Sequence, residues 1–587
     1  MRIRVPSGIG FDIGSLATTG VDHISVYRGP AAMIHGAGAL TGAIELGVAP
    51  GQPRHTTSLS SSALVGSFQS QEVAASAQIP VKKRGSARAA FNLRKAQGDF
   101  PFIDAQGTPQ RRTNNDHFHL QGIASGNWRG PRGVLGLSLL LEKGSSGVAG
   151  PSEFQNLFGA ARHDEQRIVA TSNGTRRDVL SGDTWTIDMS RTFGLQWRGL
   201  HYSNDQAVLG QGLYENSSSA TSSEANVAFL LSTASHYYTH LSAGARTEIF
   251  DSSTSTSPSL SQAPARTPFD ARRRTLSLAT GHEKIFFDNR LHLTGAARAE
   301  IVTARREEQS DYLPWMAAAG FIYKPVPRQL DLQLIGNIAQ TYRVPDFDEL
   351  YLDTEFVRGD PDLSPERALM ADLGVRMHTP DDIPRYLLPE RLELVAFSNL
   401  IHDQIAFVPA SAYLILARNF DRVRARGLEA SLDYEPLSSI RLTSSYSFTQ
   451  TYRPDLIPRV QLPSQPVHRA DARLFIELAR LFSLQKTPAL TLSSRASWRS
   501  AVNLDTFGSQ RNPAWLRLDA GLNYRPLTWL SFQLDITNLL DYQRAVDSLQ
   551  RPLPGRAVFG SVSIQKDVKN RHDGNHEDDN DIRPSTP

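Results

Sequence analysis

The chain contains no cysteine in its 587 residues. Disulfide bonds, cysteine-bound zinc and thiol catalysis are therefore excluded, which suits a cell-envelope protein that needs no redox control. The sequence also lacks a phosphate-binding loop ending in Lys-Ser or Lys-Thr, and it lacks a His-Glu-x-x-His metal motif. It therefore predicts no enzyme activity, no cofactor and no metal centre.

Long apolar runs are missing as well. One of the longest, Leu135–Leu141, is far shorter than the ~20 residues that a membrane helix needs. Helical crossing of a membrane is therefore excluded. A membrane β-barrel is not, because its strands need only ~9–11 residues with every second side chain apolar.

Neither sign of charge dominates, since 62 Lys and Arg stand against 59 Asp and Glu for a net charge of +3. No nucleic acid or other polyanionic partner is therefore expected. Met1–Arg4 is basic, but no apolar segment of ~7–15 residues follows it, so no signal peptide is recognised there.

A glycine-rich stretch, residues 21–46, stands apart from the rest of the chain. Alternating apolar residues over 21–26 predict a short strand. The turn Arg28-Gly29-Pro30 ends it, because proline removes a hydrogen-bond donor and glycine permits positive φ. Gly36, Gly38 and Gly42 allow close approach of backbone segments, and a second short strand is predicted at 43–46.

From Thr56 onward, apolar and polar residues alternate in segment after segment, which is typical of strands with one apolar face. After two opening strands, joined by a turn at Gly66-Ser67, clear strands are predicted at 87–96, 116–126, 133–142, 194–202, 223–232, 237–249, 273–285, 290–302, 314–324, 329–340, 367–378, 388–407, 412–434, 439–451, 467–479, 488–499, 514–524, 529–538 and 556–566. The region 164–192 holds one or two more. The total is about 22, the size class of plugged outer-membrane transporters.

The connections between these strands alternate in length. Short turns with Pro, Gly or charged residues lie at 82–86, 127–133, 324–328, 435–439 and 525–528. Long polar loops lie at 98–115, 143–163, 203–222, 250–272, 341–366, 452–466, 500–513 and 539–555. Such sorting is typical of outer-membrane barrels, and tryptophans near predicted strand ends fit their aromatic girdles. These are Trp128, Trp185, Trp197, Trp315, Trp515 and Trp529.

The glycine-rich stretch resembles the last part of the plug domain of TonB-dependent outer-membrane receptors. The family's strand with its Arg-Gly-Pro turn, its aromatic-Gly pair and its Gly-x-Ile segment correspond to Val26–Pro30, His35-Gly36 and Gly42–Ile44. His35 stands where the family usually has an aromatic residue. The plug turn motif consists of Arg28, Gly29, Pro30, Gly36 and Gly42.

Three later segments resemble the barrel of the same family, in the family's order. They are Tyr342–Tyr351 with Gly359–Glu366, Asn419 with Ala425–Glu429, and Asn538–Asp541 with Pro552–Arg556. Asp360 and Asp362 replace the usual asparagines, and both residue types suit a turn. The resemblance covers about residues 20–566.

The resemblance implies an all-β fold, a large transmembrane antiparallel β-barrel of about 22 strands with the remnant C-terminal part of a plug domain inside. The expected boundaries are 1–50 for the plug part, 56–566 for the barrel and 567–587 for a disordered polar tail. The family's signal peptide, its TonB-contacting box and most of its plug are not found. We therefore expect a misplaced start codon or a truncated gene rather than a pared-down barrel.

The function implied by the resemblance is TonB-energised uptake of a scarce ligand, such as a ferric siderophore or cobalamin, across the bacterial outer membrane. The implied partners are TonB, the ligand, and the lipid and lipopolysaccharide of that membrane, and a monomer is expected. Candidates for facing the ligand lie on one long loop, with two more tyrosines on a second. They are Tyr342, Phe347, Tyr351, Phe356 and Arg358, then Tyr202 and Tyr214. The sequence does not identify the ligand.

Two other interpretations stay open from the sequence. The chain could form a passive outer-membrane channel with an incomplete plug, or it could be a soluble all-β adhesion or carbohydrate-binding protein. The soluble protein would carry charges on both faces of its strands. The predicted strands are long and have one apolar face, which argues against it.

Conductance of the purified chain in a planar bilayer separates the receptor from the passive channel. A passive channel predicts a large, steady current, because its lumen is unplugged. A receptor closed by residues 1–55 and its loops predicts insertion without current. Failure to obtain any detergent-soluble barrel would contradict both membrane interpretations.

Overall fold

The computed structural model describes residues 21, 23–28, 42–47, 56–81, 84–104, 106–150, 159–207, 212–256, 269–305, 309–325, 330–354, 357–380, 382–410, 414–455, 459–482, 489–506, 508–547 and 551–569. Strands dominate this part of the chain. Its two α-helices are the single-turn α1 (Phe347–Tyr351) and α2 (Leu478–Leu481). Within these ranges no helix has the length and apolar character required to cross a membrane.

The wall of the molecule consists of long strands in chain order. They are β3 (Thr56–Gly66), β4 (Ser70–Val81), β5 (Gly85–Ala96), β8 (His117–Gly130), β9 (Gly133–Gly147), β10 (Arg162–Gly182), β11 (Trp185–Ala207), β12 (Gly212–Thr233), β13 (Tyr237–Thr256), β14 (Phe269–Phe286), β15 (Leu291–Arg305), β16 (Gln309–Tyr312), β17 (Trp315–Tyr323), β18 (Asp331–Arg343), β20 (Glu366–His378), β21 (Arg391–Pro409), β22 (Ile415–Leu437), β23 (Ile440–Tyr452), β24 (His468–Glu477), β25 (Ala489–Arg499), β28 (Trp515–Leu527), β29 (Leu530–Thr537) and β30 (Ala557–Lys569).

Short elements lie outside this wall. They are β1 (His23–Arg28), β2 (Gly42–Gly47), the 3-10 turn η4 (Ser67–Gln69), β6 (Pro101–Ile103), β7 (Pro109–Arg111), β19 (Val357–Arg358), β26 (Val502–Asn503) and β27 (Arg511–Asn512).

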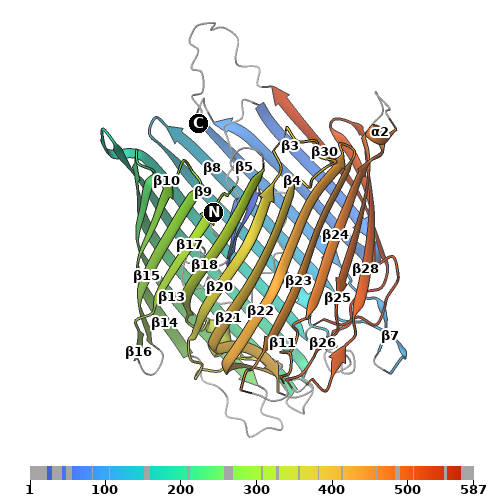
Figure 1. Ribbon diagram of the computed structural model, residues 1–587. Helices are drawn as coiled ribbons and strands as arrows, with labels where there is room; N and C mark the ends of the chain where they lie inside the picture. Colours follow the sequence, from blue (N-terminus) through green and yellow to red (C-terminus); the bar gives the residue numbers. More distant parts are fainter. Residues whose placement is uncertain are drawn as a thin grey trace.

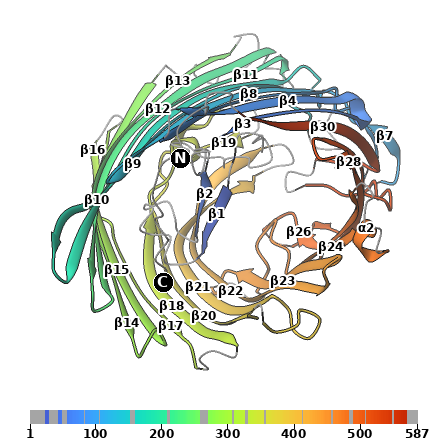
Figure 2. The same cartoon turned by 90° about the horizontal axis from the view of Figure 1, so that it is seen from above.

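The wall strands close into one antiparallel barrel (Figures 1 and 2). Each strand pairs with the next along the chain, and the last strand, β30, pairs with the first, β3. The predicted count of about 22 strands is confirmed. β16 and β17 both pair with β15 and act as one interrupted strand, and the two-residue β19 pairs in parallel with β22.

The outer face of the barrel is apolar because every second side chain points outward. In β9, Leu135, Leu137, Leu139 and Leu141 are exposed, whereas Leu140 between them is fully buried. The same alternation runs around the barrel, and it places a band of leucines, isoleucines, valines and phenylalanines where lipid tails would lie.

The inner face is polar, and its charges are paired across or along neighbouring strands. Side-chain nitrogen and oxygen atoms approach within 2.6–3.5 Å in pairs such as Arg94–Glu72, Arg167–Glu142, Arg298–Glu300, Arg376–Glu393 and Arg495–Asp471. The hairpin of β1 and β2 lies inside the ring of strands (Figure 2). Val21, just before it, packs against the inward-facing cluster of Ile123, Leu140 and Val169.

Most short turns and long loops lie at opposite ends of the barrel, as predicted (Figure 1). The exceptions include the short turn η4, which lies at the loop end, and the 12-residue connection between β20 and β21, which lies at the turn end. Strands β10–β13 have 20 to 23 residues, about twice what the membrane needs, and β22 has 23 as well. The predicted loop 203–222 is therefore wrong, since most of it belongs to β11 and β12. The ambiguous region 164–192 holds β10 and the start of β11, so Trp197 lies within a strand rather than near its end.

The reason for this error is visible in the outward side chains of β12. Ser217, Ser219 and Ser223 occupy outward positions in its first half, at the end of the barrel with the long loops. A strand segment that extends beyond the membrane has water on its outer face, so its outward side chains need not be apolar. The apolar alternation is then lost, and the sequence pattern predicts a loop. A smaller difference lies at the other end of the chain, where β30 continues past the predicted limit at 566 to Lys569.

One glycine and one asparagine in the segments that resemble the receptor family have clear structural roles. A Cβ atom on Gly427 would lie 2.0 Å from the carbonyl oxygen of Phe448 and 2.9 Å from the ring of Phe397. Asn538 has positive φ, and its side-chain amide donates to the carbonyl oxygens of Tyr542 and Pro554, which holds the closing loop together.

We predict that Gly427→Ala destabilises the barrel by about 1–3 kcal/mol, because the methyl group must displace a backbone carbonyl. The matched control is Gly295→Ala in β15, where a Cβ atom would meet no atom within 4 Å. It should stay within about 0.5 kcal/mol of the parent. Urea unfolding of the refolded protein, followed by tryptophan fluorescence, measures both. Equal effects of the two substitutions would contradict the close packing at Gly427.

Candidate functional site

The long connection between β18 and β20 folds into the mouth of the barrel. It begins with Val344–Asp346, forms helix α1, and returns through β19 to Glu366. The Asp346 backbone N–H donates to the Glu349 carboxylate at 2.8 Å, a capping box that starts the helix. Asp348 and Glu349 stand in the first turn, where the helix dipole favours negative charge.

Arg343, the last residue of β18, joins both ends of this connection. Its guanidinium donates to the two carboxylate oxygens of Glu349 at 2.8 and 2.9 Å and to Glu366 at 2.9 Å. The second oxygen of Glu366 accepts the backbone N–H of Ile405 at 2.6 Å. All four of these hydrogen bonds, three from Arg343 and one to Glu366, involve an ionised group, which makes them stronger than neutral hydrogen bonds.

A second ion pair fastens α1 to the tall side of the wall. Arg198 of β11 donates to both oxygens of Asp348 at 2.7 and 2.8 Å. Their side chains are only 6% and 2% exposed. A buried charge must be paired to persist, so each residue here requires the other.

A third contact comes from β13 and β14. Arg273 donates to Glu248 at 2.8 Å and to the carbonyl oxygen of Pro345 at 2.6 Å. Its guanidinium also lies over the ring of Phe347, 4.7 Å from the centroid, and that ring packs 5.5 Å from Phe250. Burial raises the pKa of the nearby Asp346 carboxyl to about 7, against the attraction of Arg273.

The returning half of the connection is held by the neighbouring strands β21 and β22. Leu363 packs with Ile405 and Ala417. The side-chain amide of Asn419 accepts from the Ser364 N–H at 2.8 Å and donates to the Ser364 carbonyl at 2.9 Å. We call the described parts of this connection, 344–354 and 357–365, together with their partners in the wall, the mouth anchor.

The predicted ligand-facing residues occupy different positions in this structure. Tyr342 is buried against Met316, and Phe347 is buried in the mouth anchor. Tyr351 is half-buried, and the side chain of Arg358 is 38% exposed beside Asp353. Phe356 lies outside the described residues. Ligand contact by these five residues stays a prediction, and the accessible positions are Tyr351 and Arg358.

The two tyrosines of the second predicted loop lie on β11 and β12 and are buried. The rings of Tyr202 and Tyr214 meet edge to face at 6.0 Å. The Tyr214 hydroxyl donates to the carbonyl oxygen of Asp353 at 3.1 Å. The two tyrosines therefore belong to the part of the wall that supports the mouth anchor.

Of the plug turn motif, Arg28 and Gly42 pair directly across the β1–β2 hairpin. Gly29, Pro30 and Gly36 lie outside the described residues.

Sequence reasoning missed the wall half of the mouth anchor, namely Arg198, Glu248 and Arg273. Their only local signal is a charged residue at an inward position of a predicted strand, and many inward positions of a barrel are polar. Among the described residues, no group of three or more His, Asp or Glu side chains is placed to hold a metal ion. The arrangement is suited to holding a loop at the mouth.

Comparison with known proteins gives a match to one protein family. The family model described as TonB dependent receptor-like, beta-barrel matches residues 97–539. No curated protein gives a significant sequence match.

Solved structures are similar over nearly the whole chain. The copper transporter OprC is 13% identical with a TM-score of 0.76, covering 96% of this chain and 88% of that one. BauA, the ferric preacinetobactin receptor from Acinetobacter baumannii, is 14% identical with a TM-score of 0.70, covering 94% and 86%. The FrpB iron transporter from Neisseria meningitidis is 13% identical with a TM-score of 0.72, covering 94% and 88%. At these identities the likeness concerns the fold.

We predict that Arg343→Gln loosens the mouth anchor, because Glu349 and Glu366 lose their cation while largely buried. Removing one partner of a buried pair costs about 3–5 kcal/mol. Amide hydrogen exchange over 347–363 should therefore accelerate, while the neighbouring strands stay protected.

The control is Arg480→Gln, which removes an exposed pair with Glu477 whose side chains are 62% and 45% exposed. Exposed pairs contribute little, so exchange should not change. Unchanged exchange over 347–363 in Arg343→Gln would show that the ion pairs do not hold the segment.

Proposed function

The chain belongs to the TonB-dependent receptor family, and we propose that it takes up a scarce metal chelate, such as a ferric siderophore or cobalamin, in a TonB-driven step. Membership makes it a β-barrel of the bacterial outer membrane and a receptor rather than an enzyme. The proposal concerns the ligand and the energised step.

The observation that carries this proposal is the mouth anchor inside a closed barrel. Long loops bind ligands best when a rigid scaffold positions them. Here Arg198, Arg273 and Arg343 fasten the connection 344–365 to the wall, so its accessible residues are held in place before a ligand arrives. Preorganisation of this kind lowers the entropy cost of binding.

The chemistry of the accessible residues suits a metal chelate. The Arg358 side chain, 38% exposed beside its ion-pair partner Asp353, can donate to an anionic group of the ligand. The half-buried Tyr351, whose ring packs near Phe250 and Phe347, offers its remaining aromatic surface. The structurally similar OprC, BauA and FrpB carry the names of a copper transporter, a ferric preacinetobactin receptor and an iron transporter, which supports a metal-containing ligand.

Uptake in cells tests the proposal. The chain is expressed in a strain that lacks its own receptors, and cells are offered radiolabelled ferric catecholate, ferric hydroxamate and cyanocobalamin. We expect uptake of at least one probe, and we expect it to disappear when TonB is deleted. Uptake that continues without TonB would identify the alternative, a passive channel. Absence of uptake for every probe, with the barrel present in the membrane, would contradict the proposed ligand class.

We further predict that Arg358→Gln weakens binding of the probe taken up by about tenfold, because one charge-assisted hydrogen bond to the chelate is lost. Titration of the purified protein, followed by tryptophan fluorescence, measures the affinity. The control Arg480→Gln makes the same change in charge at the opposite end of the barrel and should bind normally. Equal affinity of both variants for the probe would show that Arg358 does not contribute to binding it.

A further inference from the structure

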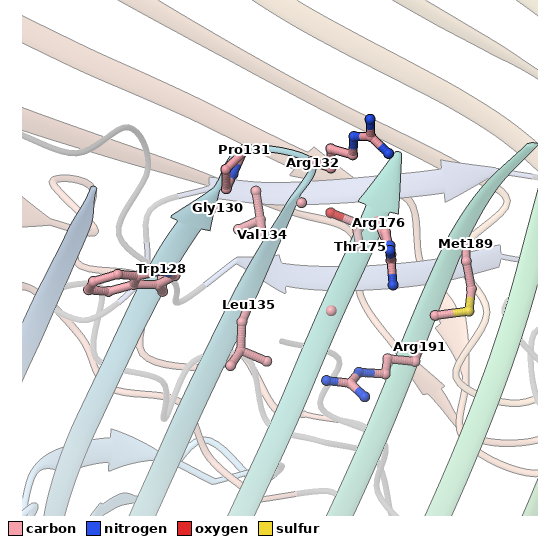
Figure 3. A pocket seen from close by; sticks show the side chains of 12 residues that line it. Trp128, Gly130, Pro131, Arg132, Val134, Leu135, Thr175, Arg176, Met189 and Arg191 are labelled. Carbon is pink, nitrogen blue, oxygen red and sulfur yellow. The ribbon is translucent and has the colours of Figure 1, made fainter. Parts of the chain in front are cut away.

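A hollow of about 560 Å³ lies on the outer face of the barrel, where β8–β11 reach the end with the short turns (Figure 3). Its volume is within the ~300–1,000 Å³ typical of small-molecule sites. The transport function of the barrel makes no use of it, since the side chains that shape it point away from the lumen.

The register of four neighbouring strands explains the hollow. Trp128, Leu135, Gly174 and Arg191 lie directly opposite one another on the outer face. In the next outward row, Gly130 and Gly133 are followed by Arg176 and Met189.

Three glycines in these rows leave the outer surface without side chains between the aromatic and the basic residues. A Cβ atom on Gly133 would lie 2.2 Å from the carbonyl oxygen of Thr175, and one on Gly174 would lie 2.9 Å from Nε of Arg191. Gly130, Gly133 and Gly174 all line the hollow, and the absence of side chains there leaves this part of the outer surface open.

Three guanidiniums surround the hollow. Figure 3 shows Arg176 and Arg191 on the side opposite Trp128, with Arg132 above them in the turn. Within the ranges described above, none of the three forms an ion pair with a carboxylate. The arginines of the inner face differ, because Arg167 on the same strand β10 pairs with both Glu142 and Glu165.

The hollow stands at the edge of the membrane. Below it, Leu137, Leu139 and Leu141 belong to the exposed apolar band. Above it is the two-residue turn Pro131-Arg132, and short turns of outer-membrane barrels face the periplasm. Trp128 is 44% exposed at this level, as in the aromatic girdles at membrane interfaces.

We propose that this hollow binds the headgroup of an anionic phospholipid from the periplasmic leaflet. The phosphate accepts hydrogen bonds from Arg132, Arg176 and Arg191, and the acyl chains run along Leu135 and the leucines below it. A net anionic headgroup is favoured over a zwitterionic one, because the lining residues include three cations and no carboxylate for an ammonium group. The inference is independent of the ligand that the barrel transports.

Native mass spectrometry of the delipidated full chain, titrated with phosphatidylglycerol or phosphatidylcholine, tests this site. The parent should retain one phosphatidylglycerol more tightly than any phosphatidylcholine. The variant Arg132→Gln/Arg176→Gln/Arg191→Gln should weaken that binding by about tenfold or more.

The matched control is Arg385→Gln/Arg441→Gln/Arg480→Gln. It removes three exposed arginines at the same end of the barrel, each of which pairs with a carboxylate. It should leave phosphatidylglycerol binding unchanged. Equal losses in the two triple variants would mean that net charge alone attracts the lipid, and this would overturn the site.

A second variant tests the shape of the hollow at constant charge. Gly174→Val fills the space beside Arg191 and should also weaken phosphatidylglycerol binding, while circular dichroism confirms an intact barrel. Unchanged binding in this variant would contradict a headgroup seated in the hollow, whatever the effect of the arginines.

Discussion

Closure of the barrel is the constraint on which the rest of this structure depends. In lipid, every backbone N–H and C=O group must find a partner within the protein, and an open sheet would leave two edges unpaired. The chain meets this demand by pairing β3 with β30, from Thr56 opposite Lys569 to Gly66 opposite Phe559. Residues 493 to 513 positions apart in the chain therefore make the seam that all other strands require.

Closure separates two environments, and charged residues behave differently in each. On the inner face and in the mouth, many arginines are paired with carboxylates, and in the buried pair Arg198–Asp348 the two side chains are only 6% and 2% exposed. On the outer face near the periplasm, Arg132, Arg176 and Arg191 have no such partner in the described part of the chain. A counter-ion for them has to come from outside the protein, which is why a lipid phosphate fits there.

The uneven height of the wall links the fold to its function. Strands β10–β13 extend beyond the membrane at the end with the long loops. There their inward residues Arg198, Glu248 and Phe250 contact the connection from β18. The side chain of Phe347 packs against these strands and is buried, whereas Tyr351 and Arg358 are more exposed than Phe347. Rigid support and accessible residues thus come from different parts of the chain that meet only in the mouth.

The sequence by itself determined the all-β class, the strand number and the sorting of short turns and long loops, because alternation of side chains and turn residues are local signals. It also identified Gly427 and Asn419 as special positions. The end of β11 after residue 202 and the first half of β12 escaped it, because a strand with water on its outer face loses its apolar alternation. The partners Arg198 with Asp348 and the row Trp128–Leu135–Gly174–Arg191 were decided only by the tertiary structure, because strand register brings together residues that no local pattern connects.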